Sequence, residues 1–224
     1  MYVYCSLTTK KGLVMKRLDS LALSNTIDLH EEGLKRLRRM WLDPKVLFYE
    51  DKIPRGSSDE KTVFLAGPTS RDGIPDYMWR KDAVHFLRVH GCTGNILVPE
   101  PRGYSYLAED CEDDFTDAER IYEWEHEGIR NATYPIVWIP RNMQQLLGLT
   151  TNREIGQLMG RAEHETLLSK NLFIGWPQSA KKIGSLEFEL RKAEVGFLKG
   201  EHFTSLEELC KEIGSRFEND DIPF

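Results

Sequence analysis

The fold is decided by the stretch Lys61-Thr62-Val63-Phe64-Leu65-Ala66-Gly67-Pro68. Its short apolar run ends at Gly67-Pro68, a pattern typical of a buried strand that enters a loop. After this loop, residues 79–89 place apolar side chains at helical spacing, and Gly91 ends that pattern. The sequence therefore predicts a strand, a loop and a helix in this order.

Three further apolar runs follow the same plan. They are Asn95-Ile96-Leu97-Val98-Pro99, Tyr134-Pro135-Ile136-Val137-Trp138-Ile139 and Asn171-Leu172-Phe173-Ile174-Gly175-Trp176, with helical segments between them. Strands that alternate with helices indicate a parallel sheet, and nearly continuous apolar strands indicate burial on both faces. We therefore expect a doubly wound α/β fold, whose ligands bind at the carboxyl ends of the strands.

Both ends of the chain add to this core. Residues 205–217 predict a last helix that docks on the sheet, opened by Ser205 and Glu208 at capping-box spacing. Residues 1–58 predict a small α/β extension and linker, with a helix at residues 29–41 and a strand at residues 46–49. The predicted division is 1–58 for the extension and 59–224 for the main domain.

Composition limits the possible partners. The 224 residues are 40% hydrophobic and 29% charged, as in ordinary globular proteins, and the net charge of −6 argues against binding of polymeric nucleic acid. No apolar run approaches the ~20 residues that span a bilayer, and no signal peptide is recognisable, so we expect a cytoplasmic protein that binds no membrane. The four cysteines are scattered, which predicts reduced structural thiols rather than a metal site.

The loop after the first core strand is rich in polar groups. Gly67 allows a close backbone approach, and Thr69 and Ser70 supply hydroxyl groups. Arg71 and Arg80 have the side chain that grips a phosphate or a carboxylate with two hydrogen bonds. The alternative is an ordinary surface turn with solvated arginines.

Residues 118–131 form a predicted helix whose apolar stripe contains an acid. Glu125 falls in the stripe with Ile121, Trp124 and Ile129. Burial of a carboxylate is costly and raises its pKa, so functional use is one interpretation, and pairing with an arginine or exposure at the edge is the other. The acidic run at residues 109–119 favours a solvated loop over a metal site, because it lacks the frame of a calcium loop.

A second acid, Glu154, stands in Gly148-Leu149-Thr150-Thr151-Asn152-Arg153-Glu154-Ile155-Gly156. Thr151 and Glu154 have capping-box spacing, which would explain both without catalysis. The segment also follows the carboxyl end of a strand, where α/β ligand sites gather, and it adds Asn152 beside the carboxylate. The residues alone leave both interpretations open.

These segments resemble the nucleoside 2-deoxyribosyltransferase superfamily, in particular its transferase-like branch. The resemblance covers residues 62–176 and rests on five strings in order: Val63-Phe64-Leu65-Ala66-Gly67-Pro68-Thr69 with Arg71, Trp79-Arg80, Val98-Pro99-Glu100, Trp124-Glu125 with Gly128-Ile129-Arg130, and Thr151-Asn152-Arg153-Glu154-Ile155-Gly156. It implies a flavodoxin-like or Rossmann-like sheet of about five strands. It also implies a homo-oligomer in which neighbouring subunits complete each other's sites.

The resemblance gives the residues their roles. Glu154 would be the nucleophile and Glu125 would contact the base of a nucleoside or nucleotide, with no metal and no organic cofactor. The substrate-binding residues would be Gly67, Pro68, Thr69, Ser70, Arg71, Trp79, Arg80, Glu100 and Asn152. Transfer to a second base and hydrolysis remain equally open, and a nucleotide-binding sensor without turnover is the alternative from another class.

Two departures from the family pattern bear on the substrate. Gly148 stands where the well-known transferases of this superfamily have an aspartate, six positions before the nucleophile, and no tyrosine equivalent is recognisable near the C-terminus. Sugar recognition must therefore differ. Ser70, Arg71 and Arg80 suit a 5′-phosphate better than a free hydroxyl, which makes a nucleoside 5′-monophosphate N-glycosidase the alternative activity.

Overall fold

A computed structural model describes residues 43, 45–54, 60–69, 79–102, 118–143 and 146–219. The chain divides into two compact units, Met1–Arg39 and Met40–Phe224, and all described residues belong to the second. The helix predicted at residues 29–41 lies outside the described residues, as do Ser70, Arg71 and most of the acidic run at residues 109–119.

The second unit is built on one parallel sheet of five strands. These are β1 (Val46–Phe48), β2 (Thr62–Ala66), β3 (Asn95–Val98), β4 (Tyr134–Trp138) and β5 (Phe173–Gly175). They run in the order β1-β3-β2-β4-β5, and every neighbouring pair is parallel. The four strands predicted for the core are confirmed. The sheet also takes β1 from the segment before residue 58, and the division of the chain at that residue stays a prediction.

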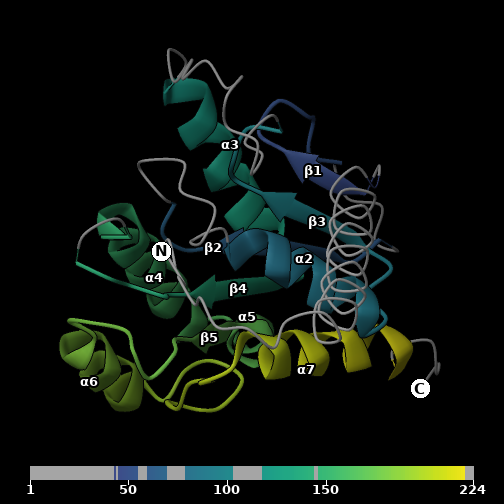
Figure 1. Cartoon of the computed structure of the whole chain (residues 1–224). Helices are drawn as coiled ribbons and strands as arrows, with labels where there is room; N and C mark the ends of the chain where they lie inside the picture. Colours follow the sequence, from purple (N-terminus) through teal and green to yellow (C-terminus); the bar gives the residue numbers. More distant parts are fainter. Residues whose placement is uncertain are drawn as a thin grey trace, which may run out of the picture. The chain divides into compact units, whose positions relative to one another are not determined.

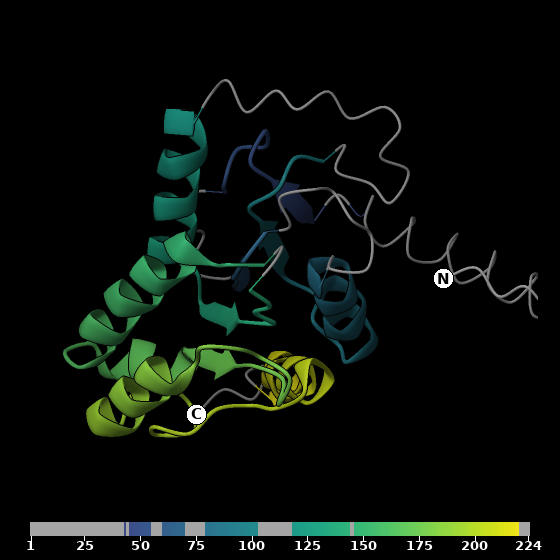
Figure 2. The ribbon, with the colours of Figure 1, turned by 60° about the vertical axis from the view of Figure 1, so that its left-hand side comes forward.

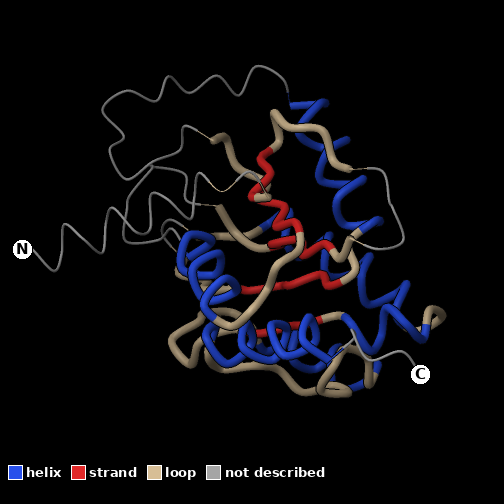
Figure 3. Tube along the Cα trace, turned by 90° about the vertical axis from the view of Figure 1, so that its right-hand side faces the viewer, coloured by secondary structure: helices blue, strands red, loops and turns tan. Residues whose placement is uncertain are grey.

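Helices cover both faces of the sheet. They are α2 (Trp79–Val89), α3 (Ala118–Asn131), α4 (Leu149–Ala162), α5 (Thr166–Asn171), α6 (Gly184–Ala193) and α7 (Leu206–Asn219), labelled in Figure 1. Figure 2 shows the strands between α3 and α4 on one side and α2 and α7 on the other. Figure 3 shows the same strands in red, with blue helices on either side.

The side chains of β2 explain this double cover. Val63 and Leu65 belong to the apolar cluster that contains α2 and α7, whereas Phe64 and Ala66 belong to the cluster that contains α3 and α4. Successive strand residues point to opposite faces, so a strand buried on both sides must be apolar throughout. The predicted doubly wound α/β fold is confirmed.

The strand order creates a switch point beside β2, where doubly wound folds have the crevice that binds their ligands. The chain passes from β2 through α2 to β3, and then through α3 to β4 on the other side of β2. The loops that leave β2 and β4 therefore diverge from neighbouring carboxyl ends, which is the switch point where doubly wound folds bind ligands. This crevice positions the site described below.

The last helix is capped as predicted. The backbone N–H of Glu208 donates to the Ser205 hydroxyl at 3.3 Å. Gly214 then allows α7 to approach α2 closely, because a Cβ at this position would collide with the backbone carbonyl of His90. The helix is held at its first turn and by close packing farther along.

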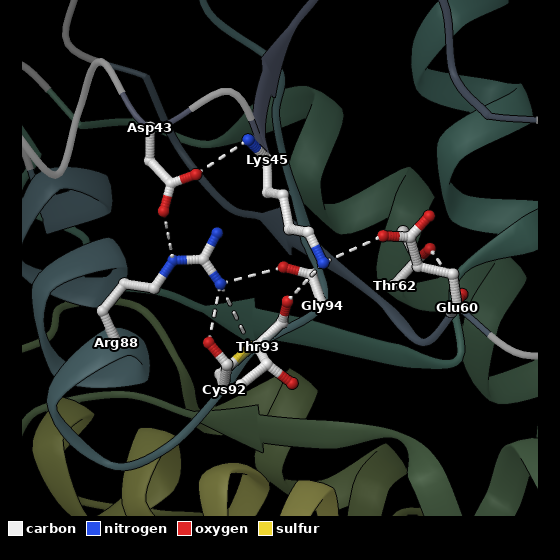
Figure 4. A network of polar contacts seen from close by, with 8 residues as sticks. All are labelled: Asp43, Lys45, Glu60, Thr62, Arg88, Cys92, Thr93 and Gly94. Carbon is white, nitrogen blue, oxygen red and sulfur yellow. Dashed lines mark hydrogen bonds and ion pairs between the residues drawn. The ribbon is translucent and has the colours of Figure 1, made fainter.

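Polar contacts fasten the opposite, amino-terminal edge of the sheet (Figure 4). Arg88 at the end of α2 donates to the carbonyls of Cys92 at 2.6 Å and Gly94 at 2.9 Å, just before β3 begins. Lys45, just before β1, donates to the Thr93 carbonyl at 3.0 Å and pairs with Glu60 at 3.1 Å. This network ties the starts of neighbouring strands together, away from the crevice.

Candidate active site

The loop after β2 approaches its neighbours closely at Gly67. A Cβ at Gly67 would collide with the backbone carbonyl of Trp138 at the end of β4 and lie 2.6 Å from the indole ring of Trp79. The Trp79 indole donates to the Pro68 carbonyl at 3.0 Å. Only glycine allows this approach, so the loops after β2 and β4 lie side by side at the crevice.

Arg80 makes hydrogen bonds that hold the same loop in place. It is 2% exposed, and its guanidinium donates to the carbonyls of Leu65 at 3.1 Å and Gly67 at 2.5 Å. It also donates to the Thr69 hydroxyl at 3.1 Å and to the Glu100 carboxylate at 2.6 Å. The substrate contacts assigned to Arg80, Thr69 and Glu100 stay predictions, and in this structure Arg80 donates to both of the others.

The capping-box interpretation of Glu154 is wrong. Helix α4 begins after Gly148, whose φ of 63° makes it a left-handed cap without a side-chain hydrogen bond. Thr151 therefore lies inside the first turn, where it is fully buried, and its hydroxyl has no hydrogen-bond partner among the described residues. Glu154 is thus one turn farther along α4, where it has no capping function.

Glu154 faces into the unit rather than toward solvent. It is 6% exposed, and within the described ranges no hydrogen bond or ion pair holds its carboxylate. Burial raises its pKa above the ordinary value, while the positive charges of Arg80 and Arg153 oppose that rise. A buried and unpaired carboxylate beside a crevice is costly to maintain, which makes it a candidate for function.

Glu125, on α3, interacts with Glu154. Gly128 allows this helix to lie close to β2, because a Cβ there would lie 2.6 Å from the Phe64 ring. Glu125 is partly buried, and its pKa is raised to about 7, first by burial and then by the negative charge of Glu154. Arg80 and Arg153 oppose this rise as well. The structure therefore brings the two predicted carboxylates into electrostatic contact.

The two acids do not lose their protons together. The charge of Glu154 raises the pKa of Glu125, whereas burial alone raises the pKa of Glu154. Because two negative charges repel each other, ionisation of one acid opposes ionisation of the other. Over the pH range between the two ionisations, the pair consists of one carboxylate and one carboxylic acid, which is the arrangement that nucleophilic catalysis with acid assistance needs.

Asn152 lies beside Arg141 and away from Glu154. Its side-chain oxygen accepts a hydrogen bond from Arg141 at 2.5 Å, in a groove of about 410 Å³ between α4 and α6. Residues 152 and 154 project from nearly opposite sides of a helix, because two residues turn it by about 200°. The structure thus brings Asn152 to Arg141 and not to Glu154, and its role toward substrate stays a prediction.

Arg141 is a further candidate residue that the sequence did not reveal. It is buried, donates to the carbonyl of Lys182 at 3.2 Å and of Gly148 at 3.4 Å, and pairs with no carboxylate in the described part of the chain. A Cβ at Gly148 would lie 3.5 Å from its guanidinium, 3.4 Å from the Thr151 hydroxyl and 3.3 Å from Pro68. Two hydrogen-bond donors, the Thr151 hydroxyl and the Arg141 guanidinium, therefore lie near Gly148.

Comparison with known proteins agrees with this geometry. Residues 60–171 match the family described as nucleoside 2-deoxyribosyltransferase like. The chain belongs to this family. The matched region contains the loop after β2, Arg80, Glu125 and Glu154, so the family match and the convergence of these residues concern the same part of the fold.

No curated protein matches the chain. Membership in the deoxyribosyltransferase-like family indicates an enzyme class that acts on nucleosides. In the described ranges, no helix has both the length and the apolar character needed to cross a membrane. The cytoplasmic location and the homo-oligomer stay predictions.

Proposed function

We propose that this chain cleaves the N-glycosidic bond of a nucleoside or nucleotide through a covalent glycosyl intermediate on Glu154. The observation that carries the proposal is the pair of interacting acids, with Glu154 buried and unpaired and the pKa of Glu125 raised to about 7 by burial and by the charge of Glu154. One acid is thereby available as a nucleophile and the other as a proton donor near neutral pH.

In the first step, a carboxylate oxygen of Glu154 forms a bond to the anomeric carbon of the sugar while the bond from that carbon to the base nitrogen breaks. The electron pair of the broken bond leaves with the base, which takes the proton of Glu125. The transition state resembles an oxocarbenium ion, so the negative charge of Glu154 stabilises it before the new bond is complete.

In the second step, water or a second base attacks the anomeric carbon, and Glu154 leaves as a carboxylate. Glu125, now ionised, accepts the proton that the attacking water or base releases. Two displacements at one carbon give net retention of configuration. Water gives hydrolysis and a second base gives transfer, and both outcomes regenerate the starting protonation state.

The surroundings of Gly148 favour a second candidate, a nucleoside 5′-monophosphate N-glycosidase. No acidic side chain occupies this position, and the buried Thr151 hydroxyl and Arg141 guanidinium lie near it at the start of α4. Helix N-termini and arginines favour anions. A phosphate would therefore be accepted where an aspartate would repel it.

Chromatography of released bases tests the proposal. The wild type is incubated with deoxynucleosides and deoxynucleotides, with and without a free acceptor base, beside Glu154→Gln and the control Glu163→Gln, which changes an exposed acid at the end of α4. We expect base release by the wild type and the control and none by Glu154→Gln. Release that is equally slow in the wild type and in Glu154→Gln, with ligand still bound, would mean a sensor module without turnover.

Two further readouts separate the candidates. Product that forms only with acceptor base indicates transfer, and product without acceptor indicates hydrolysis. Gly148→Asp introduces a negative charge, and aspartate tolerates the positive φ of this position. The variant should therefore weaken the use of deoxynucleotides far more than that of deoxynucleosides. An equal loss for both substrates would contradict the phosphate assignment.

A further inference from the structure

The groove between α4 and α6 lies on the side of α4 that carries Asn152, which is turned by about 200° from the side that carries Glu154. The two helices lie side by side in Figures 1 and 2. The volume of the groove, about 410 Å³, falls within the ~300–1,000 Å³ that small-molecule sites have. The groove can therefore hold a small molecule on the face of α4 that Glu154 does not share.

A buried arginine lines this groove. Arg141 is 7% exposed, and its Nη1 donates to the Lys182 carbonyl at 3.2 Å. Its Nη2 donates to the Gly148 carbonyl at 3.4 Å and to the Asn152 side-chain oxygen at 2.5 Å. All three acceptors are neutral, and Nε is buried without a hydrogen-bond partner in the described part of the chain. A buried cation is costly without an anion beside it, so this guanidinium favours an anionic ligand.

The missing partner belongs to one edge of the guanidinium. Nε and Nη2 share an edge that can donate two parallel hydrogen bonds to one carboxylate. On this edge, Nη2 is held by the neutral amide of Asn152, an exposed side chain that itself lines the groove, and Nε has no partner among the described residues. A carboxylate in the groove would replace the amide oxygen and give Nε its acceptor.

The start of α6 favours negative charge at the same end of the groove. The Lys182 carbonyl that accepts from Arg141 lies two residues before α6 begins, and Ser185 in the first turn lines the groove. No side-chain hydrogen bond caps this helix. The first N–H groups of a helix lack partners within it and carry partial positive charge. The helix start therefore adds to the attraction of Arg141 for an anion.

The rest of the groove suits an apolar body with a single charge. Its lining includes Ile155, Met159 and Leu186 together with two glycines of α4, at each of which a Cβ would meet nothing within 4 Å. Two acids, Glu163 and Glu189, also line it. Their charges oppose a second negative charge on a ligand, so a carboxylate fits better than a phosphate monoester, which carries about −1.5 to −2.

We propose that this groove binds a small monocarboxylate with an apolar body, whose carboxylate accepts from Nε and Nη2 of Arg141. Asn152 gives up its bond to Nη2 as the carboxylate enters, and the apolar body lies along Gly156 and Gly160. The inference goes beyond the proposed function and does not depend on the roles of the two acids.

The test is a titration of the protein with phenylacetate, followed by NMR of methionine methyl groups labelled with ¹³C. Met159 lines the groove, and Met159→Leu assigns its signal. We expect a saturable shift of this signal. Phenylacetamide has nearly the same shape without the charge, so it should bind about tenfold more weakly or worse. Phenyl phosphate should also bind more weakly than phenylacetate.

Two variants locate the bound probe. Arg141→Gln removes the charge and should weaken binding by about tenfold or more. Gly156→Leu should abolish binding, because its side chain fills the groove while leucine suits a helix better than glycine does. Gln157→Leu is the matched control, since it places the same side chain at an exposed position of α4 outside the groove, and it should bind as the wild type does. If Arg141→Gln does not fold, Gly156→Leu decides.

Absence of saturable binding would overturn the inference. So would equal binding of phenylacetate and phenylacetamide, tighter binding of phenyl phosphate, or unchanged binding by Gly156→Leu. Glu154→Gln should bind the probe as the wild type does. A wild type that binds the probe but releases no base would refute the proposed function alone, and one that releases base but binds no probe would refute this inference alone.

Discussion

Glu125→Gln should make the protein more stable at high pH while it removes activity. Below pH 4.5 the carboxyl group of Glu125 is protonated in both the folded and the unfolded chain, so it adds no pH dependence. As pH rises from 4.5 to about 7, the unfolded chain releases this proton and the folded chain does not, so the wild type loses stability. Above pH 7 both states are ionised and the loss is complete.

The size of the effect follows from the pKa. A rise from 4.5 to about 7 corresponds to roughly 3 kcal/mol of stability lost by the wild type at pH 8 relative to pH 4. Glutamine has no charge to bury, so the variant avoids this loss. For a chain of this size, the melting temperature of the variant should exceed that of the wild type by roughly 6–12 °C at pH 8 and by little at pH 4.

Thermal or urea unfolding at pH 4 and pH 8 measures this difference, and base release is followed in parallel. The matched control is Glu123→Gln, an exposed acid on the same helix, which should melt with the pH dependence of the wild type. A variant at position 125 that tracks the wild type at both pH values would refute the burial argument. If Glu125→Gln loses stability as much as it loses activity, Glu125 contributes to folding and not to the reaction.

Three other outcomes follow from the same coordinates. Gly67→Ala should destabilise the unit by about 1–3 kcal/mol in urea unfolding, because its Cβ would collide with backbone; the control Gly156→Ala, with nothing within 4 Å, should instead stabilise it by about 0.5–1 kcal/mol. Glu154→Gln removes the charge that raises the pKa of Glu125, so the midpoint of a pH titration of Glu125 by NMR should fall below 7, and an unchanged midpoint would show that the acids do not interact. Cys92, whose pKa burial raises to about 11, and the fully buried Cys210 should stay unreactive toward a thiol reagent at pH 8 until the chain unfolds, and rapid labelling of either in native protein would contradict their burial.

The sequence predicted the core elements because burial on both faces requires a recognisable pattern of apolar residues. A strand covered on two sides is continuously apolar, and the helices over it carry apolar stripes, so α2 and α3 begin and end where their patterns predict. Helix α6 has no such apolar pattern in its sequence. Leu190 is its one residue that is buried in the described structure, and a single buried residue makes no stripe.

The candidate site was predictable in its acids but not in its surroundings. Thr151 and Glu154 match a local capping pattern, yet packing buries Thr151 and starts the helix at Gly148, which only the tertiary structure decides. Arg80 was expected to grip an anion because arginines do so. Its actual partners include backbone carbonyls that turn inward at Gly67, and sequence cannot show which way a carbonyl points.

The division of roles between the two acids does not need two different environments. Both are substantially buried, and the same two arginines, Arg80 and Arg153, act on each of them. The difference arises because one acid ionises first and its charge then opposes ionisation of the other. The first ionisation thereby leaves two distinct protonation states, which is how paired carboxylates come to serve as nucleophile and acid. The roles therefore belong to the pair, and a change to either acid alters the chemistry of both.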